Sequence, residues 1–546
     1  MHRLRLKTCA AGLSLLAAIF CIGACDSGGA PASLPSGNNP TPAPGGGGPT
    51  WTSGVFAPAS QFKNRCQVVR TGVDIEGNTF PDMAGSTLLE NFWLRSWTHE
   101  TYLWNTEVVD RNPANYNNRL QYFDLLRTTA TTPSGKDKDD FHFSQPTADF
   151  LAQRNSAPRS GYGVSYAAIA VTPPRDFRIQ YTEPGSPAAD EVMGLANFIR
   201  GARILEVDGV DLVNANTQAE VDILNAGLFP ETAGEMHTFL VQDAGSATSR
   251  TVFLISEDIA PETVHTFDII NTPTGDVGYA HITTFSPFAA EQDIADAISA
   301  MQSAGVSDAV LDMRYNGGGL LAIASQLGYM VAGNARTSGK TFERLQFNAA
   351  AGNRNPVTGE INLPIPFYST GLGFSVASGT PLASLNLGRV FILTTEETCS
   401  ASEAVINGLR GAGVEVILIG GTTCGKPYGF YPQDNCGETY YTIQFRGVNH
   451  LGFGDYADGF APSNSGEMFA VNTPGCSAAD DLNHALGDED EGLLAAALQY
   501  RSDGSCPAAA MMSASASAFA SPSEAGIAIS PSKDLMQSNR DMTMPQ

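Results

Sequence analysis

The arrangement of apolar and polar residues divides the chain into three stretches of different periodicity. Across residues 88–104, large apolar side chains recur at a spacing of three to four, which predicts a helix. From Gly161 to about Glu257, short β-prone runs alternate with turn residues. From about residue 260 to 500, strand-like runs, glycine loops and helix-like runs follow one another, as in an α/β domain. We therefore expect a small N-terminal helical domain (55–155), a compact β-rich domain (156–258) and an α/β core domain (259–506).

The two ends of the chain differ in composition from this middle part. Residues 1–24 start with a basic segment, continue as an apolar run of roughly 13 residues and end in small residues before Cys25. That order is typical of a signal peptide, the run is too short to span a bilayer, and its end resembles a bacterial lipoprotein box. Residues 25–54, rich in Pro, Gly and Ser, predict a tether, and residues 507–546, rich in Ala and Ser, predict a disordered tail.

These ends predict an exported chain that is lipid-anchored through Cys25 to a membrane of the bacterial cell envelope and faces the periplasm or the exterior. An ordinary secretory signal with a chance cysteine is the alternative. Loss of Arg3, Arg5 and Lys7 with the signal peptide changes the formal net charge from −25 to −28. A chain this negative is not expected to bind nucleic acid.

Cysteine content predicts disulfide bonds. Six cysteines follow Cys25, and an even number in an oxidising compartment favours disulfides over metal. Two pairs are favoured by the segments that they enclose: Cys424 with Cys436, and Cys476 with Cys506. We expect Cys399 to be a small buried hydrophobe. The scattered histidines and the lack of paired CxxC motifs predict neither a metal site nor a cofactor.

Ser400 lies where a strand-like run passes into a predicted helix, residues 400–410. At a helix N-terminus, free N–H groups and the helix dipole stabilise the negative charge that develops when a carbonyl is attacked, and the Ala401 N–H is the natural donor. Ser400 and Glu403 also fit a capping box, in which the two residues cap each other's backbone. Taken alone, the segment favours a structural role.

Lys426 favours catalysis instead. It follows the next strand-like run, 414–419, and successive strands tend to be neighbours, which brings it back toward Ser400. A serine hydroxyl needs a base at neutral pH, and a buried lysine with a neutral amine can act as one. Residues 420–426 also nearly match a phosphate-binding loop, but Pro427 replaces the residue that would hold magnesium, so we expect no nucleotide.

Three ordered motifs together resemble the carboxy-terminal processing (tail-specific) protease family: D-M-R-Y-N-G-G-G at 312–319, T-C-S-A-S-E at 398–403 and G-K at 425–426. The family's more usual D-L-R-N-N-x-G-G appears here with Met313 and Tyr315. The resemblance implies a role for each of five residues: Ser400 as nucleophile, Lys426 as general base, Glu403 as a supporting hydrogen-bond partner, and the N–H groups of Ala401 and Gly318 as the oxyanion hole. Which glycine of 317–319 donates stays open.

The β-rich domain resembles a PDZ domain, which captures a peptide carboxy-terminus with backbone N–H groups and adds the peptide as a strand. The resemblance implies a carboxylate-binding loop formed by Gly161, Tyr162, Gly163 and Val164. A spacer domain with a blocked groove is the alternative.

The leading hypothesis is a serine endopeptidase with a Ser-Lys dyad that acts on exported or membrane-associated proteins or peptides. A second is a catalytically silent peptide-binding lipoprotein, because fold does not fix function. A third is a Ser-His hydrolase of similar fold, with His281 or His265 as the base.

Overall fold

A computed structural model describes residues 48–155, 157–508, 529, 540–542 and 544. The predicted signal peptide, the lipid-carrying Cys25 and most of the predicted tether and tail lie outside these residues. From Pro49 onward the described residues form one compact unit. Within this described part of the chain, no helix has both the length and the apolar character that a membrane span needs.

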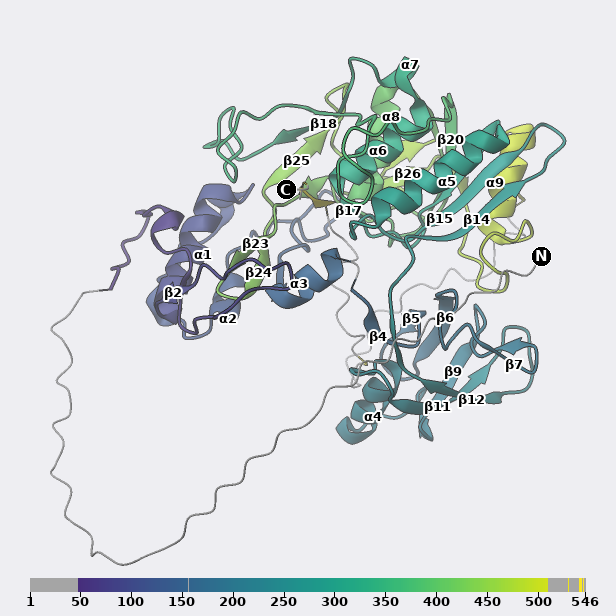
Figure 1. Cartoon of the computed structure of the whole chain (residues 1–546), viewed down its shortest axis with the longest axis horizontal. Helices are drawn as coiled ribbons and strands as arrows, with labels where there is room; N and C mark the ends of the chain where they lie inside the picture. The colour runs from purple at the N-terminus through teal and green to yellow at the C-terminus, as the bar shows by residue number, and fades with distance from the viewer. Residues whose placement is uncertain (1–47, 156, 509–528, 530–539, 543, 545–546) are drawn as a thin grey trace, which may run out of the picture. The chain divides into compact units, whose positions relative to one another are not determined.

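A six-stranded sheet is the centre of the expected α/β domain (Figure 1). Five of its strands run parallel, and the first is antiparallel to its neighbour. Most of the parallel strands are buried along nearly their whole length, with apolar residues in their middle, because both faces of the sheet are covered. In sheet order the strands are β14 (Val264–Ile270), β15 (Val277–Ile282), β16 (Asp308–Asp312), β20 (Arg389–Thr394), β21 (Glu415–Gly420) and β28 (Gly475–Ser477).

Helices cover the two faces of this sheet. One apolar core lies under α5 (Ala290–Ala304), α6 (Leu321–Ala332) and α8 (Ala401–Ala412), and a second lies under α9 (Gly492–Asp503). Because β16, β20 and β21 are parallel, the loops that follow them leave the sheet at the same edge. Those three loops carry the three motifs, so the topology gathers them in one place.

The β-rich stretch folds as expected into its own sheet, with β5 at one edge. Its helix α4 (Gln218–Leu228) begins at a capping box made by Thr217 and Glu220. The sheet strands in spatial order are β12 (Arg250–Ile255), β11 (Met236–Gln242), β9 (Arg203–Val207), β6 (Asp176–Thr182) and β5 (Val164–Ala170), with β10 (Val210–Asp211) beside β9. Two short pairs accompany it: β4 (Arg159–Gly161) with β13 (Glu257–Ile259), and β7 (Glu191–Val192) with β8 (Leu195–Ala196).

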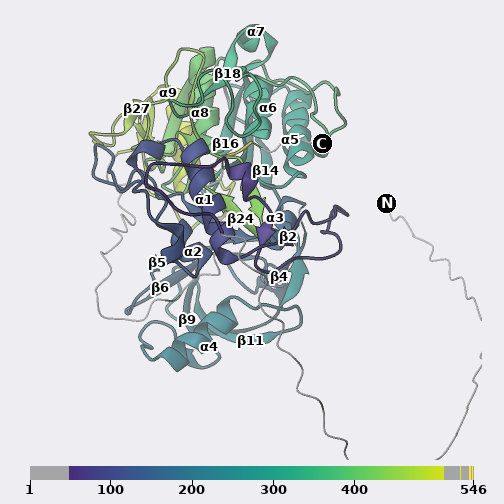
Figure 2. The same cartoon turned by 90° about the vertical axis from the view of Figure 1, so that its left-hand side faces the viewer.

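The N-terminal stretch contains the predicted helix as α1 (Thr87–Thr101), but it is not a separate helical domain. Its strand β3 (Phe143–Pro146) pairs with β24 (Glu438–Tyr441), far along the chain. Trp93 and Trp97 of α1 pack on Tyr440 of β24, and both views show α1 beside that strand (Figures 1 and 2). The other elements here are α2 (Arg119–Phe123), α3 (Thr147–Arg154), β1 (Arg65–Cys66), β2 (Met83–Ala84) and 3-10 turns at Ala59–Gln61, Asn105–Glu107 and Pro113–Asn115.

Short strands complete the core domain beside the central sheet. They are β18 (Thr341–Gln346), β19 (Ile365–Pro366), β22 (Tyr428–Gly429), β23 (Gln433–Asn435), β25 (Phe445–Val448), β26 (Phe460–Pro462) and β27 (Val471–Thr473), with the short helix α7 (Asn334–Thr337). Near the glycine loop, β17 (Gly319–Leu320) pairs in parallel with β29 (Arg540–Asp541). The expectation of a disordered tail therefore does not hold for these two tail residues.

Candidate active site

Ser400 occupies the sharp turn between β20 and α8. Its backbone has φ 60° and ψ −110°, a left-handed conformation that costs a non-glycine residue of order 1–3 kcal/mol and that clusters at functional sites. The residue is fully buried, and its Oγ makes no hydrogen bond of normal geometry to any described residue. The expected capping box between Ser400 and Glu403 is present, but the contact of the Ser400 hydroxyl with the Glu403 N–H falls short of hydrogen-bond geometry, so the hydroxyl is left available.

Glu403 supplies one half of this capping box, and its carboxylate does more than cap. Its Oε2 accepts the N–H groups of Ser400 (2.9 Å) and Lys426 (2.8 Å). Its Oε1 accepts the Gly425 N–H (2.9 Å) and the Thr423 hydroxyl (2.6 Å). Burial raises the pKa of this carboxyl, although these hydrogen bonds oppose the shift. Glu403 thus joins the segments that carry the predicted nucleophile and base, which fits its implied supporting role.

Lys426 is fully buried, and its Nζ lies 4.5 Å from the ring centre of Phe141 and 4.7 Å from that of Phe430. Burial disfavours the charged ammonium and lowers the pKa of Lys426 to about 7, although Asp139 and Glu403 act in the opposite direction. A substantial fraction of the amine is therefore neutral near pH 7. This is the property that a lysine base requires.

Three disulfide bonds join the six described cysteines: Cys66–Cys436, Cys399–Cys424 and Cys476–Cys506. The expected bond between Cys476 and Cys506 is present. The expected bond between Cys424 and Cys436 was wrong, and so was the interpretation of Cys399 as an unpaired core residue.

A contact across the whole chain explains the incorrect pair. The Asn64 N–H donates to Asn435 Oδ1 (2.7 Å), which brings Cys66 up to Cys436 at the β23–β24 turn. Cys424 then bonds to Cys399, next to the nucleophile. These sulfurs and Glu403 form the one cluster of metal-type donors in the described residues, but sulfurs in a disulfide are not thiolate ligands.

The two N–H groups implied for the oxyanion hole have different backbone surroundings. Ala401 is the first residue of α8, so its N–H belongs to the free end of that helix. The Gly318 N–H, in contrast, donates to Asn316 Oδ1 (2.9 Å) and is engaged within the loop. For Gly318 to act as the implied donor, the hydrogen bond from its N–H to Asn316 Oδ1 must break. Gly317 and Gly319 are the alternative donors within the loop.

The loop needs glycine for packing as well. Gly319 has φ 135°, and a Cβ there would lie 2.3 Å from the backbone of Phe285 and of Ser286. The Leu320 N–H in turn donates to the Phe285 carbonyl (3.0 Å). Close packing thus accounts for this glycine without reference to chemistry.

Asn316 is a site residue that the sequence reasoning did not single out. Besides holding Gly318, its carbonyl accepts the Cys399 N–H (3.0 Å) and the Ser402 hydroxyl (2.9 Å), and its amide donates to the Ile282 carbonyl (3.1 Å). It therefore ties the glycine loop to the turn of the nucleophile. Its position directly before three glycines was the available signal.

The histidines of the Ser-His alternative lie in other environments. Burial lowers the pKa of His281 to about 3, and its ring packs edge-on against Tyr315. The Nε2 of His265 lies 2.8 Å from the Thr182 carbonyl oxygen. Neither histidine is hydrogen-bonded to Ser400 in the described structure, so this alternative has no geometric support.

The residues predicted to bind a peptide carboxylate meet at the start of the edge strand β5. Gly161 ends β4 and Val164 begins β5, so the loop between them is only Tyr162 and Gly163. The Tyr162 hydroxyl donates to the Gly227 carbonyl of α4 (3.0 Å), which fixes the loop against the helix. Gly163 has φ 69°, a left-handed conformation that favours glycine.

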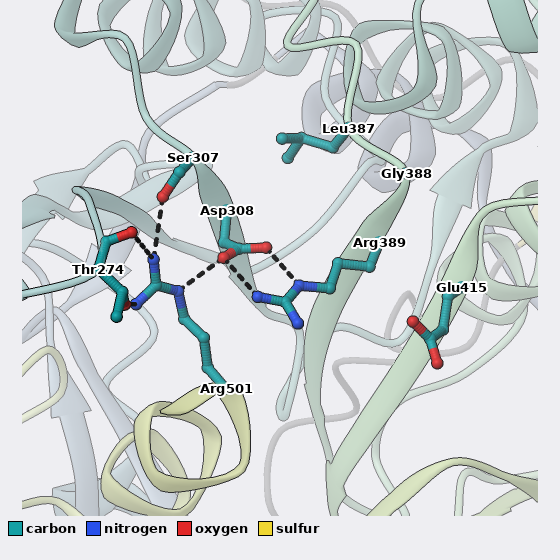
Figure 3. A pocket seen from close by; sticks show the side chains of 8 residues that line it. All are labelled: Thr274, Ser307, Asp308, Leu387, Gly388, Arg389, Glu415 and Arg501. Carbon is teal, nitrogen blue, oxygen red and sulfur yellow. Dashed lines mark hydrogen bonds and ion pairs between the residues drawn. The ribbon is translucent and has the colours of Figure 1, made fainter. Parts of the chain in front are cut away.

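A cavity of about 640 Å³ lies at the opposite edge of the central sheet, where β16, β20 and β21 begin. Figure 3 shows Arg389 and Arg501 both reaching the carboxylate of Asp308. Its two arginines are paired to Asp308. The cavity also lies at the opposite ends of the strands from the loops that carry Ser400 and Lys426, so it is not part of the candidate active site.

Comparison with known proteins agrees with this site. Residues 276–430, which include Ser400, Glu403, Lys426 and the glycine loop, match the model of Peptidase family S41. The chain therefore contains a peptidase S41 family domain. No curated protein matches the chain.

Solved structures resemble the fold more broadly. The crystal structure of a putative S41 protease from Bacteroides fragilis NCTC 9343 has a TM-score of 0.57 at 22% identity, covering 78% of this chain and 99% of that one. The photosystem II D1 C-terminal processing protease has a TM-score of 0.38 at 17% identity, over 70% of this chain and 92% of that one. Mature CPAF complexed with lactacystin has a TM-score of 0.37 at 13% identity, covering 69% of this chain and 92% of that one. The first likeness supports a mixed α/β fold of the S41 protease type.

Proposed function

We propose that the chain is a serine endopeptidase that hydrolyses peptide bonds with Ser400 as nucleophile and Lys426 as general base. The observation that carries the proposal is the shared Glu403 carboxylate, which binds the backbones of both residues. Two further properties support it: the hydroxyl of Ser400 has no hydrogen-bond partner among the described residues, and the pKa of Lys426 is lowered to about 7 by burial. The S41 domain match supports the same reaction class.

The reaction follows from these groups. Neutral Lys426 Nζ takes the proton of Ser400 Oγ as the oxygen attacks the peptide carbonyl carbon. The tetrahedral oxyanion accepts the Ala401 N–H at the N-terminus of α8. The ammonium of Lys426 then returns the proton to the leaving amine, and an acyl-enzyme remains on Ser400. Water, deprotonated by Lys426, hydrolyses this ester and restores the hydroxyl.

A fluorophosphonate probe tests the proposal, because it labels only an activated serine. We expect labelling of the wild-type chain and none of Ser400→Ala, and loss of peptide cleavage by about 10³-fold or more in Lys426→Met. The exposed residues Ser338 and Lys136 supply matched controls, Ser338→Ala and Lys136→Met, that should keep both activities. Full labelling of Lys426→Met would remove lysine from the mechanism. No labelling of any variant would favour the catalytically silent binding protein.

The β-rich domain extends this proposal to substrate selection. We propose that the loop from Gly161 to Val164 binds the carboxylate of a substrate chain end, which then lies along the edge strand β5. Ser400→Ala should bind a fluorescent peptide with a free carboxy-terminus more tightly than the same peptide carrying a carboxamide. Equal affinity for the two peptides would favour a spacer domain.

For location, we propose that the chain is exported and anchored by a lipid on Cys25 in the bacterial cell envelope, so that its substrates are exported or membrane-associated proteins. The order of basic, apolar and small residues before Cys25 supports this. Cys25→Ser should move the chain from the membrane fraction to the soluble fraction. A membrane-bound Cys25→Ser chain would contradict the lipid anchor.

A further inference from the structure

The C-terminal tail meets the core domain between two strands that both leave the candidate active site. On one side, Arg540–Asp541 pair in parallel with Gly319–Leu320, the strand that directly follows the glycine loop. On the other side, the Met542 N–H donates to the carbonyl of Phe430 (3.3 Å), next to the strand Tyr428–Gly429 that follows Lys426. The backbone of residues 540–542 thus lies between the strand after the glycine loop and the strand after Lys426.

Side-chain packing continues this contact. Met542 is partly buried against the apolar core under α6, and a small cavity beside it is lined by three residues of the core domain and two of the tail. They are Ala322, Ile365, Tyr368, Met542 and Met544. A backbone held on both sides and an apolar side chain in a recess are the two features by which an extended peptide binds a groove.

A second part of the tail contacts the β-rich domain. Ile529 is 1% exposed and belongs to the apolar core of that domain. Its N–H donates to the carbonyl of Val171 (3.2 Å), the residue that follows the edge strand β5. Described residues of the tail therefore contact both the core domain beside the candidate active site and the β-rich domain just beyond the edge strand β5.

We propose that the C-terminal tail is an intramolecular inhibitor that occupies the substrate groove between Gly319–Leu320 and Tyr428–Phe430. The proposal rests on the proposed function, because the groove is a substrate groove only if Ser400 and Lys426 cleave peptides. A tethered segment competes at a high effective concentration, so a substrate must bind the minority of molecules in which the tail has left. The occupant is an extended segment, Arg540–Met542, with the apolar side chain of Met542 in the recess.

A binding experiment on the inactive protein tests the tail without relying on catalysis. The Ser400→Ala chain is compared with the same chain ended after Ala508, using a fluorescein-labelled peptide of residues 537–546 as the probe. We expect the shortened chain to bind the probe at least about tenfold more tightly, because no tail competes. Full-length chains carrying Met542→Glu should also gain affinity. The matched control Met468→Glu, at a methionine that is 84% exposed, should not.

An activity experiment measures the same competition, between tail and substrate for the groove, in the active chain. Removal of residues 509–546 should lower KM for an internally quenched peptide about tenfold and leave kcat unchanged, since only the free fraction of the groove changes. Equal probe affinity in the full-length and shortened Ser400→Ala chains would overturn the tail proposal, whatever the activity. No hydrolysis and no fluorophosphonate labelling in any variant would overturn the proposed function, while the binding experiment would still decide whether the tail occupies the groove.

Discussion

The backbone N–H groups of Ser400 and Lys426 donate to the same atom, Oε2 of Glu403, at 2.9 and 2.8 Å. One buried carboxylate oxygen therefore fixes the turn of the nucleophile and the loop of the base relative to each other. Because both bonds are made to backbone, they position the segments without occupying the hydroxyl of Ser400. Glu403 is therefore a positioning residue, and its replacement should lower kcat.

The first prediction concerns Glu403→Gln, which keeps the size of the side chain but replaces one acceptor oxygen with an amide donor. Loss of a charge-assisted hydrogen bond of about 1.5–3 kcal/mol should lower kcat roughly ten- to a hundredfold. Because the negative charge of Glu403 raises the pKa of Lys426, its loss should also move the midpoint of the pH–rate profile to lower pH. A slower enzyme with an unmoved midpoint would mean that Glu403 acts on structure alone.

The second prediction is the pH dependence of the wild-type enzyme. Lys426 acts as a base only when neutral, and burial lowers its pKa to about 7. We expect kcat/KM to rise with pH through a midpoint near 7 and then to level off. A free histidine would titrate in the same range, but burial lowers the pKa of His281 to about 3. His281→Asn should therefore keep the midpoint, and a lost rising limb in that variant would favour the Ser-His mechanism.

The third prediction concerns stability. The pKa of Lys426 falls from 10.5 to about 7 on folding, so the unfolded chain binds more protons between these pH values. Burial of Lys426 then lowers the free energy of unfolding by several kcal/mol at or below pH 7, and this destabilisation decreases as pH rises toward 10.5. Lys426→Met, of similar length but uncharged, should have a higher Tm than the wild type at pH 7, by a margin that narrows at pH 10. Parallel curves for the two proteins would contradict a neutral buried amine.

The sequence predicted the central α/β arrangement and the two main catalytic candidates because their signals are local. A strand-like run, a Gly-rich loop and a helix start are visible within a few residues of each other, and parallel strands bring such loops to one edge. The structure joins the backbones of Ser400 and Lys426 through Glu403.

The missed features all depend on contacts between distant residues. Cys66 bonds to Cys436 across 370 residues, and no local pattern predicts that pair. The aromatic side chains of α1 predicted a helix correctly, but their packing partner Tyr440 lies in a strand far along the chain, so the N-terminal region joins the core domain. The composition of the tail predicted disorder. Composition carries no information on which distant residues pair, so it could not predict that Arg540–Asp541 pair with Gly319–Leu320.

The last prediction tests the bond between Cys399 and Cys424, which closes the loop from the nucleophile to the base. The bond between Cys476 and Cys506 closes a loop of similar length, with separations of 25 and 30 residues, so loop entropy gives both about 3–4 kcal/mol of stabilisation. Replacing either pair by alanine should therefore lower Tm to a similar extent. Only loss of Cys399–Cys424 frees the turn that holds Ser400, so only that double variant should lose activity, by at least about tenfold in kcat, at a temperature where both variants are folded. Mild reduction of the wild type should reproduce this loss, and reoxidation should restore it. Equal activity of the two double variants would show that the bond stabilises the fold without shaping the active site.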